Sequence, residues 1–138
     1  MNILIIDSQG GGVGKSLIEK LTFLKDKGHI LTAVGTNANA TAAMLKAGAT
    51  YGATGEAAIE YNCRKAQIIA GPIGIIFTHA MHGEITSKIA AAITASDAVK
   101  VLLPINKCGA YITGIVDRPL ARDIDEAVGV IENIIQNA

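Results

Sequence analysis

The sequence predicts a three-layer α/β fold, in which helices cover both faces of a mostly parallel sheet of four to six strands. Short apolar runs alternate along the chain with stretches whose apolar residues recur every three or four positions. Strands that are linked by helices in this way lie parallel to one another. No repeat, linker or low-complexity stretch interrupts the alternation, so we expect one domain over residues 1–138.

The first two strand and helix pairs have the clearest boundaries. Residues 2–6 form an apolar strand, a glycine-rich turn follows, and a helix then runs to Gly28. Residues 30–35 form the second strand, and a helix near 39–47 ends at Gly48. Both pairs therefore have the strand, turn and helix order of a parallel sheet.

The middle of the chain is less regular. The segment TYGATGE at 50–56 is rich in turn residues and leads into a helix over 56–65, so that two helices precede the next strand, at 67–70. The run IGIIFTHAM after Pro72 fits either a strand or a buried helical turn, because short apolar runs do not distinguish the two.

The last part of the chain predicts a helix, two strands and a long final helix. The first helix covers 86–95, a strand covers 99–105, and AYITGI at 110–115 forms a final edge strand. Asp117 and Pro119 open the last helix. Its apolar residues form one stripe, made of Leu120, Ile124, Ala127, Val128, Ile131, Ile134 and Ile135.

Right-handed crossovers between parallel strands predict a Rossmann-like or flavodoxin-like sheet, whose ligands bind at the carboxyl ends of the strands. The candidate site therefore lies at residues 7–15, 36–39, 71–74 and 106–108. The residues expected to contact a ligand there are Asp7, Ser8, Gln9, Gly10, Gly11, Gly12, Val13, Gly14, Lys15, Thr36, Asn37, Gly71, Pro72 and Asn106.

Charge and cysteine content restrict the partners. Lys plus Arg and Asp plus Glu number 12 each, so the net charge is zero and we expect no nucleic acid or membrane partner. Only 17% of residues are charged, against about 25% in a typical domain, so apolar surface is expected to form a homo-oligomer. Cys63 and Cys108 form no CxxC pair, and Met1 precedes a strand without a leader, which predicts a cytoplasmic protein.

The glycine turn is the strongest functional signal. Four of the five residues from Gly10 to Gly14 are glycine, so the backbone can adopt positive φ and let an anion approach bare N–H groups. The helix from Val13 adds a partial positive charge and Lys15 adds a full one. A tight turn without a ligand is the competing interpretation, but the strand, turn and helix context favours a small phosphate-bearing ligand.

The same residues resemble a P-loop incompletely. QGGGVGKS places Gly14, Lys15 and Ser16 on the terminal GK[ST], and it is similar to the deviant Walker motif KGGVGK[ST] of the ParA-type ATPases. However, Gln9 replaces the first glycine of the P-loop and Gly10 replaces the signature lysine. No later strand ends in an Asp that could hold magnesium, so an NTPase is disfavoured.

A dinucleotide turn is the other interpretation. GGGVGKSLIEKL followed by KGHILTAVGTN resembles the start of the short-chain dehydrogenases, with Gly12, Val13 and Gly14 on their GIG. The resemblance implies NAD(P) or another nucleotide as the cofactor. Thr36 and Asn37 stand where a ribose would lie, without the acidic residue that marks NAD or an arginine for NADP. Asn37 could instead cap the following helix.

Most of the chain between positions 5 and 106 resembles one bacterial family. The segments that carry the resemblance are IDSQGGGVGK, GTNANATAAMLKAGA, GATGE, AGPIGII, GEIT and LLPIN. They are similar to the family catalogued as domain of unknown function 3842. The resemblance implies a Rossmann-like fold with its site at the glycine turn, and it names no reaction.

We therefore expect a protein that binds a nucleotide or dinucleotide, with catalysis left open. A deviant P-loop ATPase or GTPase and a non-catalytic metabolite sensor or assembly subunit are the alternatives. His79, His82 and Glu84 could be drawn as a metal site, but HxxH alone is common and we expect no metal. Cys108 is interpreted as an inert, partly buried thiol, since no base accompanies it.

Overall fold

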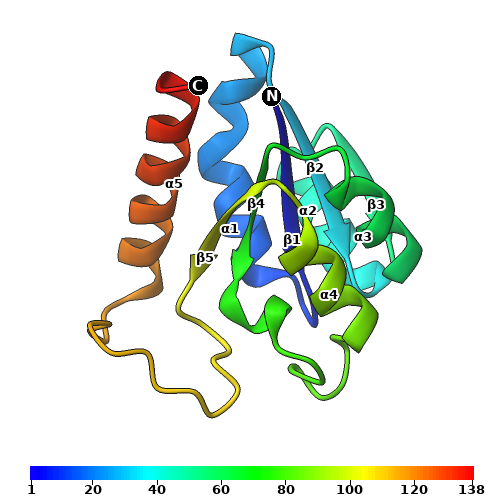
Figure 1. The fold of residues 1–138 in the computed structure, drawn as a ribbon. Helices are drawn as coiled ribbons and strands as arrows, with labels where there is room; N and C mark the ends of the chain where they lie inside the picture. Colours follow the sequence, from blue (N-terminus) through cyan, green and yellow to red (C-terminus); the bar gives the residue numbers. More distant parts are fainter.

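The computed structural model describes residues 1–138 and confirms the α/β fold. One sheet of five parallel strands has the order β3-β2-β1-β4-β5 (Figure 1). The strands are β1 (Asn2–Asp7), β2 (Ile30–Gly35), β3 (Tyr51–Thr54), β4 (Ile68–Pro72) and β5 (Val99–Leu103). This order matches the first five strands of a Rossmann sheet.

Helices cover both faces of the sheet and complete the three predicted layers. One face carries α1 (Gly12–Leu21), α2 (Ala38–Lys46) and α5 (Leu120–Gln136), and the other carries α3 (Glu56–Cys63) and α4 (Ser87–Ala95). Two short 3-10 helices, η1 (Thr22–Lys27) and η2 (Ile73–Ile76), follow α1 and β4. The run after Pro72, which fitted two interpretations, thus forms a helical turn. None of the helices has the length and apolar content of a membrane span.

The central strand β1 supplies both hydrophobic cores. Ile3 and Ile5 lie in the core beneath α1, α2 and α5, whereas Leu4 and Ile6 lie in the core beneath α3 and α4. All four are at most 1% exposed. Burying an aliphatic side chain of this size stabilises a fold by about 1.5–3 kcal/mol. The strand has a continuous apolar sequence because successive side chains point to opposite faces and both faces are covered.

The final helix confirms the predicted apolar stripe except at its first position. Ile124, Ala127 and Ile131 are buried against the sheet. Val128, Ile134 and Ile135 are partly buried beside them. Leu120 is 41% exposed and lies outside this core.

The prediction of a turn over 50–56 is wrong, because residues 51–54 form β3. This strand pairs in parallel with β2 from Thr32 to Gly35. Its side chains are mostly exposed, with Tyr51 61% exposed, since β3 is an edge strand. An edge strand without a buried apolar face lacks the hydrophobic pattern from which strands are predicted.

The predicted edge strand over 110–115 is also wrong. These residues belong to the loop 104–119, which joins β5 to α5. Turns at residues 108–109 and 113–114 interrupt the apolar run, and Gly114 has a φ of 86°. β5 itself ends at Leu103 rather than at residue 105, and it is followed by Pro104, which has no N–H to donate to a ladder.

The chain reverses its direction of travel across the sheet at β1. β2 and β3 lie on one side of β1, and β4 and β5 lie on the other. Parallel sheets bind ligands in the crevice at the carboxyl ends of the strands beside such a reversal. The turn after β1 and the segment after β4 lie at this end of the sheet, toward the bottom of Figure 1.

Gly71 tests how closely β1 and β4 pack. A Cβ at this position would overlap the carbonyl oxygen of Ile6, which belongs to the backbone and has no freedom to move aside. We expect Gly71→Ala to lower the free energy of unfolding by about 1–3 kcal/mol, measured by urea denaturation.

Gly129→Ala is the matched control, because a Cβ at Gly129 on α5 would meet no atom within 4 Å. It should leave the protein unchanged or stabilise it by up to about 1 kcal/mol. Equal urea midpoints for Gly71→Ala and the wild type would contradict the packing assigned to Gly71.

Candidate functional site

The glycine turn packs directly against α2. Gly11 precedes the first residue of α1 and has a φ of 74°, in the left-handed region that favours glycine. A Cβ on Gly11 would also lie 2.9 Å from the Cα and the carbonyl oxygen of Ala40. Gly14 is equally confined, since its Cβ would overlap Met44 and lie 3.1 Å from the Cβ of Asp7. These two glycines are thus explained by packing alone.

Asp7 fills the inner side of the turn. It ends β1, is 3% exposed, and accepts hydrogen bonds of 2.8 Å from the backbone N–H groups of Ser8 and Gly14. Burial raises the pKa of the Asp7 carboxyl above its ordinary value, although hydrogen bonds from Gly14, Ser8 and Val13 oppose the rise. Asp7 was predicted to contact a ligand, but its hydrogen bonds are made within the chain and hold β1 to the start of α1.

Gly10 and Gly12 differ from the other glycines of the turn. Both are exposed, neither has a φ in the left-handed region, and a Cβ on either would meet no atom within 4 Å. Their backbone N–H groups donate to no acceptor in the chain. Lys15 is exposed in the first turn of the same helix. Nothing in the fold requires glycine at these two positions, and together they leave a bare donor surface on the outer side of the turn.

Glu84 joins the glycine turn to the end of β2. Its Oε1 accepts hydrogen bonds from the Gln9 N–H at 3.0 Å, Thr36 Oγ1 at 2.6 Å and Asn37 Nδ2 at 2.8 Å. Oε2 accepts no hydrogen bond from the chain. Partial burial acts to raise the pKa of the Glu84 carboxyl, but the hydrogen bonds from Thr36, Gln9 and Asn37 outweigh burial and lower it. A half-buried carboxylate therefore lies beside Thr36 and Asn37.

Asn37 connects the same residues through its own side chain. Its Oδ1 accepts a hydrogen bond of 2.9 Å from Ala40 N–H and so caps α2. This is the capping role that the sequence offered as the alternative to a ribose contact. Its Nδ2 donates to the Gln9 carbonyl at 3.0 Å as well as to Glu84. The capping role is thus compatible with a place in the site.

The segment between η2 and α4 folds over the turn. Ser8 Oγ donates to the sulfur of Met81, and Glu84 follows three residues later. Four residues other than glycine at this contact have positive φ: Gln9, His79, Met81 and His82. Such conformations are uncommon outside glycine and cluster where surrounding contacts enforce them, often at functional sites. The contacts of Ser8 and Glu84 hold this segment in place.

Other candidate residues lie apart from this network. Gly71 and Pro72 are buried in β4, and Gly71 abuts β1. Asn106, with a φ of 59°, packs on Gly74, whose Cβ would lie 2.8 Å from that of Asn106. Val13 is half-buried against the core beneath α1. Gly71, Pro72 and Asn106 make no direct hydrogen bond to the glycine turn.

No group of three or more His, Cys, Asp or Glu side chains is arranged to hold a metal ion. His79 and His82 are both exposed, and Glu84 turns toward Thr36 and Asn37 instead. Cys63 is buried, which raises the pKa of its thiol to about 11. The expectation that Cys108 is partly buried is wrong, because it lies exposed in the loop 104–119. The polar network around Glu84 is therefore the feature that distinguishes this end of the sheet.

Comparison with known proteins identifies the family but no activity. A family model described as domain of unknown function DUF3842 matches residues 2–136. The chain belongs to this family. No curated protein matches it. In this DUF3842 protein, three of the segments that carried the resemblance meet at one carboxylate, because GEIT contains Glu84, GTNANA contains Thr36 and Asn37, and IDSQGGGVGK contains Gln9.

The pH dependence of the free energy of unfolding should show how much the charge of Glu84 stabilises this DUF3842 protein. Since folding lowers the pKa of Glu84, its charge stabilises the fold above the ordinary value of 4.5, and this contribution is lost as the pH falls through the lowered pKa. At pH 7 the free energy of unfolding of Glu84→Gln should be about 1 kcal/mol below that of the wild type. The difference should disappear in acid, as measured by urea denaturation across the pH range.

Glu19→Gln, at an exposed position on α1, is the control. It should follow the wild type at every pH. A pH-independent difference between Glu84→Gln and the wild type would show that the charge of Glu84 is not what stabilises the network.

Proposed function

We propose that this chain binds a dinucleotide of the NAD type, with the pyrophosphate on the outer side of the glycine turn. The observation that carries the proposal is the pair Gly10 and Gly12. Each is a glycine that the fold does not require, and each has a backbone N–H with no acceptor. Phosphate oxygens need this combination of close approach and free donors at a helix start.

Asp7 determines which side of the turn is open to an anion. Its carboxylate already accepts from the N–H groups of Ser8 and Gly14, so a phosphate would be repelled from the inner side. The outer side retains the donors of Gly10 and Gly12 and the charge of Lys15. The ligand phosphates therefore bind away from Asp7, toward Lys15.

This arrangement favours a dinucleotide over a nucleoside triphosphate. A P-loop uses the N–H groups that lead into its helix to hold phosphates, but here Gly14 donates to Asp7. β4 ends at Pro72 and β5 at Leu103, so neither offers a carboxylate for magnesium. The deviant P-loop ATPase or GTPase remains the weaker alternative.

Glu84 supplies the acidic group that the end of β2 lacks in the sequence. Dinucleotide-binding sheets place a carboxylate near this point to accept hydrogen bonds from the ribose hydroxyls. Glu84 lies beside Thr36 and Asn37, and its Oε2 is free. The same negative charge disfavours the 2′-phosphate of NADP(H). We therefore infer that the ligand is NAD(H). The protein itself is proposed to be cytoplasmic, with reduced cysteines.

Thermal shift measurements test the ligand class. A ligand that binds only the native state stabilises it by RT ln(1 + [L]/Kd), so at equal concentration the tighter ligand raises the melting temperature more. We expect NAD(H) to raise the Tm more than NADP(H), and ATP or GTP with magnesium to have little effect. Stabilisation only by a triphosphate with magnesium would replace the proposal by the P-loop alternative, and no shift with any of these ligands would contradict both.

Substitutions in the turn test the phosphate contacts. Gly12→Ala should keep or slightly raise the Tm of the free protein, because Ala favours the helix and meets no atom of the fold. It should nevertheless weaken NAD(H) binding at least about tenfold, since the methyl group occupies the ligand's approach. Lys15→Ala should weaken binding as well, measured by calorimetry.

Gly129→Ala and Lys20→Ala are matched controls, because they lie on α5 and at the far end of α1. Both should bind NAD(H) like the wild type. If Gly12→Ala binds NAD(H) as well as the wild type does, the outer side of the turn is not part of the binding site.

Selectivity between the two dinucleotides tests Glu84. A Gln side chain keeps the amide oxygen that can accept from Gln9, Thr36 and Asn37, but it places a donor where Oε2 accepts from the ribose. Losing a hydrogen bond to a charged group costs about 1.5–3 kcal/mol, so Glu84→Gln should bind NAD(H) at least about tenfold more weakly. Its affinity for NADP(H) should fall less or rise. An unchanged affinity ratio would exclude a ribose contact.

A further inference from the structure

The outer edge of β5 leaves backbone groups unpaired. β5 pairs with β4 alone, and the sheet ends there. The Val99 N–H donates to the Gln67 carbonyl on the β4 side at 3.0 Å. Because successive residues of a strand point their N–H and C=O groups in opposite directions, those of Lys100 and Leu102 face outward. No other segment of the chain accepts from them or donates to them.

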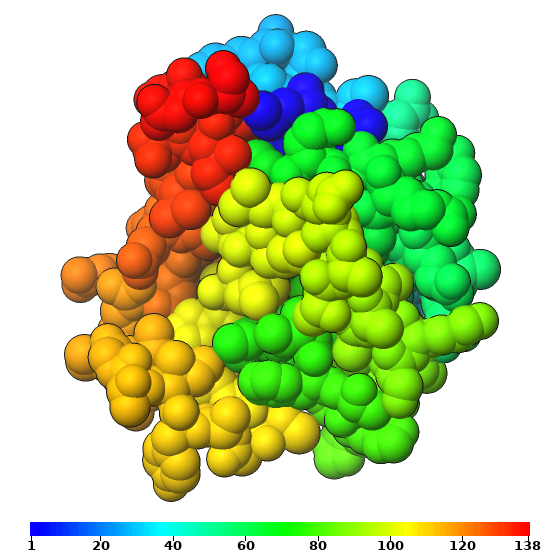
Figure 2. Space-filling model, in the orientation of Figure 1, coloured from blue at the N-terminus to red at the C-terminus, as the bar shows by residue number.

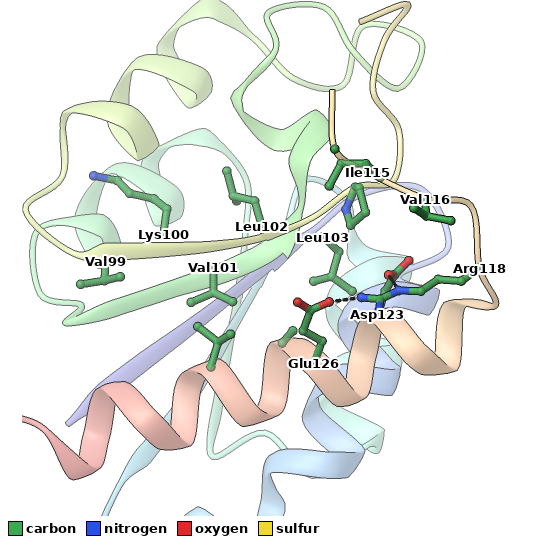
Figure 3. A pocket seen from close by; sticks show the side chains of 14 residues that line it. Val99, Lys100, Val101, Leu102, Leu103, Ile115, Val116, Arg118, Asp123 and Glu126 are labelled. Carbon is green, nitrogen blue, oxygen red and sulfur yellow. Dashed lines mark hydrogen bonds and ion pairs between the residues drawn. The ribbon is translucent and has the colours of Figure 1, made fainter. Parts of the chain in front are cut away.

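Several exposed apolar side chains surround this edge, beside the ion pairs of Arg118 with Asp123 and Glu126. Val99, Val130 and Ile115 are 49%, 43% and 44% exposed, and Val116 is 76% exposed. A cavity of about 470 Å³ is lined by β5, α5 and residues 114–116, and Figure 3 shows Val99, Val101 and Leu103 on the α5 side of the strand. Figure 2 shows the β5 region in yellow at the surface, beside the orange and red of α5. Lys100 does not cover the edge, since its Nζ donates to the Ser96 carbonyl.

We propose that the β5 edge is the interface with a second copy of this chain, paired antiparallel about a two-fold axis through Val101. Lys100 of one copy then lies opposite Leu102 of the other. These are the residues whose outward N–H and C=O groups are free, and residues that face each other in this way exchange both hydrogen bonds. The two five-stranded sheets become one continuous sheet, and a two-fold contact of this kind is closed.

Other registers of the same strand are less favourable. Placing Lys100 opposite Lys100 brings two like charges together across the strands. Placing Leu102 opposite Leu102 brings Pro104 opposite Lys100, and proline has no N–H to complete the pair. Only the register centred on Val101 uses all of the outward groups without either defect.

The charges at the two ends of β5 complement each other in this register. Asp97 is exposed just before the strand, and Lys107 is half-buried after it. Antiparallel pairing brings the start of one β5 beside the end of the other, so Asp97 of each copy lies opposite Ile105 of its neighbour, two residues before Lys107. The other edge strand, β3, is shorter, with four residues that include Gly52. We therefore place the pairing at β5 rather than at β3.

Sedimentation and light scattering test the pairing. The wild type should have twice the chain mass of 14.2 kDa at micromolar concentration. Lys100→Pro removes an outward N–H that the monomer does not use, so it should give a folded monomer with an unchanged far-UV spectrum. Lys100→Ala, which keeps that N–H, should remain a dimer. A monomeric wild type, or a dimer that persists in folded Lys100→Pro, would overturn the proposal.

A cysteine at the axis tests the register without a proline. In a Cys108→Ser background, Val101→Cys brings two thiols to a pair of opposed residues about 4.5 Å apart between Cα atoms, within the range for a disulfide. Mild oxidation should link the copies covalently. Val99→Cys in the same background faces Leu103 and should not link. Equal linking by both variants, or by neither, would overturn the assigned register.

Discussion

The hydrogen bonds of the Asp7 carboxylate hold together the part of the molecule on which the site depends. A buried carboxylate is costly unless its oxygens have donors, and here the donors are the N–H groups at the start of α1. The contact determines where β1 ends and α1 begins. Beside this contact Gly14 packs against Met44, so the protein's own side chains fill the inner side of the glycine turn. Asp7, inside the protein, thus offsets the partial positive charge at the start of α1. Only the outward N–H groups of Gly10 and Gly12 remain available to another acceptor.

Glu84 has a comparable role between segments that are distant in the sequence. It connects the crossover before α4 to the turn after β1 and to the end of β2. One oxygen of the carboxylate holds the scaffold, while the other is free. The group that would recognise a ribose is thus oriented by the fold itself, and pre-organisation of this kind reduces the ordering required when a ligand binds.

Periodicity predicted the parts of the fold in which apolar residues have a buried face. β1, β2 and the α5 stripe were found in this way. β3 was missed because an edge strand with exposed side chains has no such pattern. Residues 110–115 were wrongly predicted as a strand because their apolar residues, such as the exposed Tyr111 and Ile115, belong to a loop. The glycine turn was predicted from its composition. The position of Glu84 was not, because its partners lie 47, 48 and 75 residues away and only the tertiary fold brings them together.

The strand order also divides the sheet into two halves that differ in the sequence separation between the strands that pair. β1, β2 and β3 are neighbours in the sheet and consecutive in the sequence, whereas β4 must return to β1 across 65 residues. Contacts between near neighbours form fastest, because closing a long loop costs more entropy. We therefore expect the first half to assemble before β4 docks. Since the proposed binding site draws on both halves, a ligand bound there would slow unfolding far more than it would speed folding.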